Sequence, residues 1–81
     1  MATTYGYDRE RPEGGTVHFF DYPTLDAARR GIFFSIVDNG FAGRQVAAKL
    51  VRPLQVNESC TAGESRYTLR KHHNPNRGTD D

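Results

Sequence analysis

The segment from Thr24 to Asn39 constrains the fold more than any other part of this chain, because it has the features of a single amphipathic helix. Thr24 suits the N-cap, Asp26 lies in the first turn, where the helix dipole favours negative charge, and Gly40 suits the position after the last turn. The apolar residues form one broad stripe at about 100° per residue: Leu25, Ala28, Ile32, Phe33 and Ile36. A helix with such a stripe packs against a second layer, which the rest of the chain must supply.

Two other segments have the composition of β-strands. Residues Thr16 to Tyr22, TVHFFDY, are mostly β-branched or aromatic and are bounded by glycine and proline. Residues 64–72, ESRYTLRKH, alternate along a strand, so that Tyr67 and Leu69 share one face. The opposite face then carries Arg66, Arg70 and His72.

Residues 44–52, RQVAAKLVR, carry two competing patterns. Val46, Ala48 and Leu50 alternate as in a strand, whereas the alanines, lysine and leucine favour a helix by propensity. The strand interpretation predicts an α+β domain in which one helix packs on a short antiparallel sheet, in the order β-α-β-β. The helix interpretation predicts a winged helix-turn-helix. We favour the first, because the segment Thr24 to Asn39 is long for the helix that precedes the turn in that motif.

The chain of 81 residues is long enough for one domain at most. Residues 1–15 are expected to be a flexible N-terminal arm, because the stretch DRERPEGG is charged and rich in glycine and proline. Residues 16–72 are expected to form the α+β domain. Residues 73–81, HNPNRGTDD, are expected to be a disordered tail.

Charge and composition exclude several functional classes. A net charge of +1 argues against an acidic DNA mimic and against a strongly basic coat protein, and the single cysteine excludes an internal disulfide. No stretch approaches the roughly 20 apolar residues of a membrane span, and no leader pattern occurs at the N-terminus. We therefore expect a cytoplasmic protein without a membrane partner.

No residue pattern predicts catalysis or a cofactor. The spacings typical of zinc sites and of activated nucleophiles are missing, and adjacent His72 and His73 would point to opposite faces of a strand. Cys60 stands in a loop without a neighbouring cation in sequence, so it is expected to be an ordinary small residue. We expect no metal, no cofactor and no enzymatic activity.

Two groups of residues are candidates for binding a partner. Phe34 lies about 180° from Leu25 on the helical wheel, and Arg30 and Asp38 lie four residues to either side of it. An outward aromatic between opposite charges is typical of a protein-interface anchor, and a homodimer is the commonest way to cover it. The second group is the row Arg66, Arg70 and His72, which would suit a phosphate backbone or an acidic protein surface.

These observations favour a small non-enzymatic protein-interaction module. Compact α+β proteins without motifs are typical of phage inhibitors of host nucleic-acid-handling defence complexes, such as anti-CRISPR proteins; size and style alone carry this comparison. The alternative is a winged-helix DNA-binding regulator that contacts phosphates through its basic C-terminal half.

Overall fold

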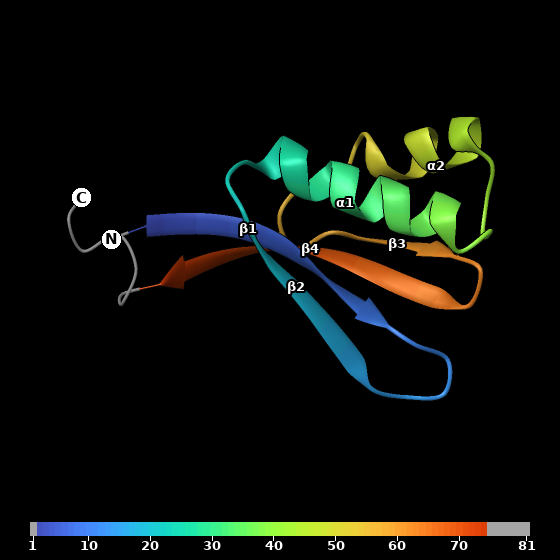
Figure 1. Cartoon of the computed structure of the whole chain (residues 1–81), viewed down its shortest axis with the longest axis horizontal. Coiled ribbons are helices and arrows are strands. Elements are labelled where there is room, and N and C mark those ends of the chain that lie inside the picture. Colours follow the sequence, from blue (N-terminus) through green and yellow to red (C-terminus); the bar gives the residue numbers. More distant parts are fainter. Residues whose placement is uncertain (1, 75–81) are drawn as a thin grey trace.

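The computed structural model describes residues 2–74 as a four-stranded antiparallel sheet with two helices packed on one of its faces (Figure 1). The elements in chain order are β1 (Ala2–Glu10), β2 (Thr16–Tyr22), α1 (Leu25–Asp38), α2 (Arg44–Val51), β3 (Ser59–Ala62) and β4 (Ser65–Asn74). The strand order across the sheet is β2-β1-β4-β3, so β2 and β3 are the edges. The predicted α+β class is confirmed.

Residues 2–10 are not part of the flexible arm that we expected. β1 is a central strand and pairs with both β2 and β4. Its charged residues are stabilised by cross-strand partners, among them Asp8, which lies opposite His18 on one side and Thr68 on the other. Only the turn between β1 and β2 matches the expectation of a loop: Arg11 donates to the Gly15 carbonyl at 3.2 Å, and Gly14 and Gly15 adopt positive φ.

The preferred interpretation of residues 44–52 was wrong, because this segment is helix α2. Ala47 and Val51, four residues apart, are buried on one side of the helix, whereas Val46 is 53% exposed. Helix propensity and the 3.6-residue period therefore outweighed the short alternation. The winged-helix alternative did predict a helix here. However, the β1–β2 and β3–β4 hairpins belong to one sheet, so the fold has the two-layer α+β arrangement.

The C-terminal boundary also differs from the expectation. His73 and Asn74, predicted to begin a tail, are the last residues of β4. The remainder of the predicted tail, 75–81, lies outside the described residues. The domain predicted as 16–72 therefore extends over 2–74.

The hydrophobic core lies between the helices and the covered face of the sheet. Its fully buried members are Ala28, Ile32, Ile36, Ala47, Tyr67 and Leu69. The stripe predicted on α1 supplies half of them, and the predicted inner face of β4 supplies two. Burial of this stripe is what holds α1 across the strands.

A β-bulge in β2 brings one more aromatic to the helix side. The register shifts between the pairs Tyr5–Tyr22 and Tyr7–Phe19, and Asp21 within the bulge has a φ of 77°. Strict alternation would place Tyr22 on the face opposite Phe19. The extra residue instead turns Tyr22 toward α1, so that both aromatics pack against the core.

Candidate functional site

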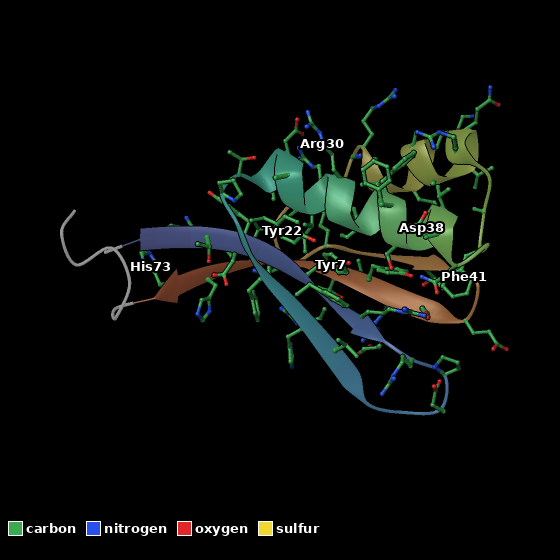
Figure 2. All side chains as sticks on the ribbon, viewed as in Figure 1. Tyr7, Tyr22, Arg30, Asp38, Phe41 and His73 are labelled. Carbon is green, nitrogen blue, oxygen red and sulfur yellow. The ribbon has the colours of Figure 1, made fainter. Side chains whose placement is uncertain are left out.

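A groove of about 620 Å³ runs between α1 and the strands β1 and β2. Its sheet side is aromatic and is formed by Tyr7, Phe19 and Tyr22. Figure 2 shows Tyr7 and Tyr22 between the helix and the strands, with Arg30 in the first half of α1 and Asp38 at its end. Phe34 completes the lining from the helix side.

The shape of this groove depends on a glycine in the helix. A Cβ at Gly31 would lie 2.5 Å from the Tyr22 hydroxyl oxygen and 3.0 Å from Cε1 of Tyr7. The missing side chain therefore lets the Tyr22 ring lie directly against α1. Within the sheet, Tyr7 stacks on Phe19 at 4.7 Å and on Tyr22 at 6.2 Å between ring centroids, and this fixes the aromatic floor.

Phe34 lies on the surface, as the helical wheel predicts. It is 49% exposed, and its ring contacts Phe33 edge-on at 5.3 Å. The other exposed large hydrophobic residues are in different surroundings: Val46 is on α2, and Phe20 contacts the rings of His18 and His72 on the far side of the sheet. Among these three, Phe34 alone lines a groove with other aromatic side chains.

The groove is bordered by opposite charges. Arg30 and Asp38 are both exposed and both line it. Across residues 2–74, neither side chain has an ion pair or a hydrogen bond. The structure thus brings the predicted trio Arg30, Phe34 and Asp38 together at one groove, with both charges available to a ligand.

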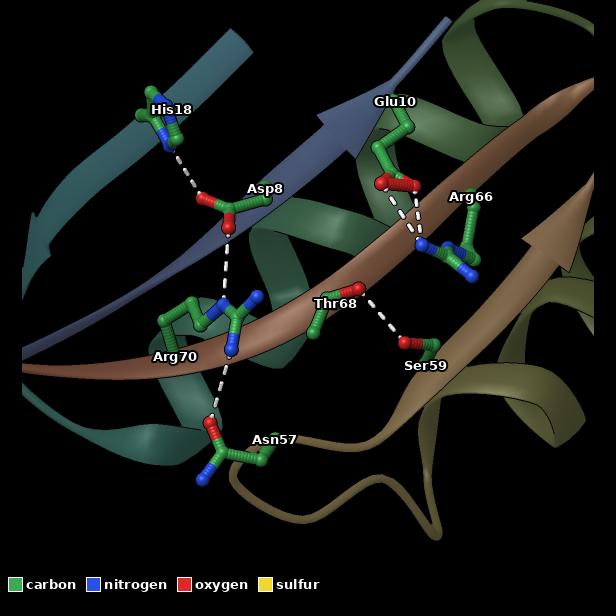
Figure 3. Close-up of polar contacts among 8 residues, drawn as sticks. All are labelled: Asp8, Glu10, His18, Asn57, Ser59, Arg66, Thr68 and Arg70. Atoms are coloured by element: carbon green, nitrogen blue, oxygen red, sulfur yellow. Dashed lines mark hydrogen bonds and ion pairs between the residues drawn. The ribbon is translucent and has the colours of Figure 1, made fainter. Parts of the chain in front are cut away.

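The predicted row of basic residues on β4 is present, but its charges are neutralised within the chain. Arg70 donates to Asp8 at 2.9 Å and to Asn57 at 3.2 Å, and Arg66 donates to Glu10 at 2.8 Å (Figure 3). The carboxylates come from β1, the strand that we had expected to be an arm. Arg66 and Arg70 therefore do not form a row of free cations for phosphates.

Asp8 is the centre of this polar network. Its side chain is 12% exposed, and its carboxylate accepts from Arg70 and, at 2.6 Å, from Nδ1 of His18. Burial alone would raise the pKa of Asp8, but the hydrogen bonds and charges of His18 and Arg70 outweigh burial and lower the pKa below its ordinary value. The network holds β2, β1 and β4 together on the face without helices.

His72 lies on this same uncovered face, and its ring is tilted by 32° against the Phe20 ring at 5.0 Å between ring centroids. His18, two residues before Phe20 on β2, stacks on the same ring at 5.9 Å between ring centroids. A Cβ at Gly6 would lie 2.7 Å from Cδ1 of Phe20, so this glycine leaves room for the Phe20 ring. His72 is thus on the opposite side of the sheet from Arg30, Phe34 and Asp38.

Cations without a carboxylate partner within residues 2–74 occur on and next to the helices, and also in the sheet layer at Arg9, Arg11 and Lys71. In the described part of the chain, Arg30, Arg44, Lys49 and Arg52 have no carboxylate within 4.0 Å. The Arg44 guanidinium lies 5.3 Å from the centroid of the Phe33 ring. The helical layer is therefore basic.

Three further observations concern metal ligands, the cysteine and membrane-spanning helices in the described residues. No cluster of three metal-ligand side chains occurs among residues 2–74. Burial raises the pKa of the Cys60 thiol, which favours the unreactive protonated form. None of the helices within 2–74 combines the length and apolarity required to cross a membrane.

Comparison of the chain with models of protein families, with curated proteins and with solved structures found no match. The function is therefore argued from the groove and the charges described above.

Proposed function

We propose that this protein is a small non-enzymatic protein-binding module, and that it docks its partner in the groove between α1 and β2. One observation carries the proposal: the half-exposed ring of Phe34 borders a groove lined with aromatic side chains, between two charges without internal partners.

The physical logic is that of an interface hot spot. Burying a fully exposed phenylalanine contributes about 1.5–3 kcal/mol, and about half of that remains available at Phe34, which is 49% exposed. Aromatic anchors beside a pocket dominate many interfaces. Arg30 and Asp38 at the rim add direction more than affinity, since opposite charges at two ends of a groove allow one orientation of a polar partner and penalise the reverse.

The test is affinity capture with three forms of the full chain: wild type, Phe34→Asp and Val46→Asp. Val46 is a matched control, because it is equally exposed but lies on α2, outside the groove. We expect the wild type and Val46→Asp to retain the same specific protein and Phe34→Asp to lose it, with unchanged circular dichroism spectra. Equal capture by all three forms, or a wild type that binds neither a foreign protein nor a second copy of this chain, would contradict the proposal.

The narrower proposal is that the partner belongs to a nucleic-acid-handling defence complex that this protein inhibits, as anti-CRISPR proteins do. Its support is the small size of the module, which still accommodates a standard interface of about 800 Å² per partner. The assay is cleavage of target DNA by purified CRISPR effector complexes at increasing protein concentration. Inhibition that Phe34→Asp abolishes is the expected result, and cleavage unaffected at a large molar excess would rule out inhibition of the complexes tested.

A second candidate function is nucleic-acid binding through the helical layer. The supporting observation is that Arg44, Lys49 and Arg52 on and next to α2 lack internal carboxylate partners, unlike the arginines of β4. Replacement of these three residues by alanine should weaken duplex binding and flatten its salt dependence, because fewer counterions are released. The control, Arg66→Ala with Arg70→Ala, should leave the slope unchanged. Affinity that does not fall with rising salt would refute this function.

A further inference from the structure

We propose that the occupant of the groove is a second copy of this chain, which forms a two-fold symmetric dimer centred on Phe34. This inference rests on the proposed function, because it requires the groove to be a protein-docking surface. The order of the charged residues along α1 indicates that the partner is another copy of this chain.

Arg30, Phe34 and Asp38 form a row along one side of the helix. Successive members are four residues apart, which is about 6 Å along the axis and slightly more than one turn. The row therefore reads positive, aromatic, negative along some 12 Å of helix surface. All three side chains line the same groove.

Such a row is complementary to itself when two helices lie antiparallel. A two-fold axis through Phe34 places the two rings against each other, and it places Arg30 of each copy opposite Asp38 of the other. Both charges lack an internal partner within residues 2–74, so the dimer supplies each with its first ion pair. A parallel arrangement would instead place like charges together.

The surroundings of the row leave room for the second copy. β2 is an edge strand, and no other strand of the described sheet lies beyond it. The helix α2 packs beside α1 on the same face of the sheet and contacts β3 (Figure 1). Arg30 also borders the hollow between the two helices, whereas Phe34 and Asp38 do not line it. The side of α1 that carries Phe34 is therefore open to another molecule.

Charge reversal gives a sharp test. The mass of the full chain in solution is measured by sedimentation velocity from about 1 µM to 1 mM for the wild type, Arg30→Asp and Asp38→Arg, separately and mixed; this range spans typical weak to moderate affinities. The wild type should dimerise. Each variant alone should dimerise at least about tenfold more weakly, because each places like charges opposite each other at both ends of the interface.

The decisive sample is the equimolar mixture of Arg30→Asp with Asp38→Arg. In a mixed dimer one copy carries two acids and the other carries two arginines, so both contacts become attractive again, and dimerisation should return toward the wild-type level. Lys49→Glu reverses an exposed charge that lines neither this groove nor the hollow shared by Arg30 and Arg52, so it is the control and should dimerise like the wild type. Circular dichroism confirms that each variant is folded.

Three results would overturn the inference: a wild type that stays monomeric throughout, dimerisation that neither reversal weakens, or a mixture that stays monomeric while the wild type dimerises. The failure of the proposed function is a separate result. If the wild type is monomeric but Phe34→Asp still loses a captured foreign protein, the groove binds that protein and only the dimer is wrong. If capture is also indifferent to Phe34→Asp, both are wrong.

Discussion

The substitution Gly31→Ala separates what helix propensity predicts from what the groove predicts. Propensity alone favours alanine by about 1 kcal/mol in a helix interior. In this structure, however, the new methyl group would lie 2.5 Å from the Tyr22 hydroxyl oxygen and 2.7 Å from its Cζ. Overpacking of this kind costs about 1–3 kcal/mol. The two terms combine to a net change between zero and a loss of about 2 kcal/mol in the free energy of unfolding.

Urea unfolding followed by circular dichroism measures this change, and a double-mutant cycle assigns its cause. In a Tyr22→Ala background the nearer ring is gone and only Cε1 of Tyr7, at 3.0 Å, remains close, so Gly31→Ala should stabilise the protein by up to about 1 kcal/mol. The sign of the effect should therefore reverse between the two backgrounds, with a coupling energy of about 1–3 kcal/mol. Stabilisation by about 1 kcal/mol in both backgrounds would refute the packing of Tyr22 against α1, and with it the floor of the groove.

Three further predictions concern titration. The pKa of Asp8 is lowered in the folded protein, so its contribution to stability is present above the ordinary carboxyl pKa and is lost as the pH falls through the lowered value. The urea midpoint of Asp8→Asn should therefore vary less below pH 4 than that of the wild type. Burial, with the neighbouring Tyr22 phenol, raises the pKa of Tyr7 to about 12. One tyrosine should therefore ionise last in an ultraviolet titration, and the free energy of unfolding should fall between about pH 10 and 12. An ultraviolet titration curve that is unchanged in Tyr7→Phe would contradict this. Cys60 should react with iodoacetamide more slowly in the folded protein than in urea, and equal rates would contradict its burial.

The helix α1 could be predicted from sequence because its signals are local. The N-cap Thr24 accepts from the Ala27 amide at 3.1 Å, and Ala28, Ile32 and Ile36 are buried as the stripe requires. The eight residues of α2 could not be assigned in this way. A segment of two turns fits both periods, and its packing against α1 decides between them.

The strand β1 was missed because its stabilising partners are remote in sequence. Asp8 and Glu10 have the composition of a solvated loop, yet Asp8 is bound by Arg70, which lies 62 residues later, and Glu10 by Arg66, 56 residues later. Such pairs follow from register, which composition does not reveal. Because the register was unknown, Arg66 and Arg70 of β4 were also expected to have no carboxylate partner within the chain.

The helix wall of the groove could be predicted from the sequence, and the sheet wall could not. The helical wheel placed Arg30, Phe34 and Asp38 on one outward face, and all three line the groove. The other wall required β1 to be a strand and β2 to contain a bulge, because only then do Tyr7 and Tyr22 face the helix. The alternation of Tyr5 and Tyr7 with small residues was the one local signal for this wall.

The most direct test of the docking groove is site-specific photocrosslinking. Phe34 is replaced by the photoreactive residue benzoylphenylalanine, and the same replacement at Val46 serves as the control, since both side chains are about half exposed. The account predicts a discrete crosslinked product from position 34, either a dimer of this chain or a complex with one other protein, and none from position 46. Equal, diffuse crosslinking from both positions would contradict the claim that Phe34 anchors a specific protein interface.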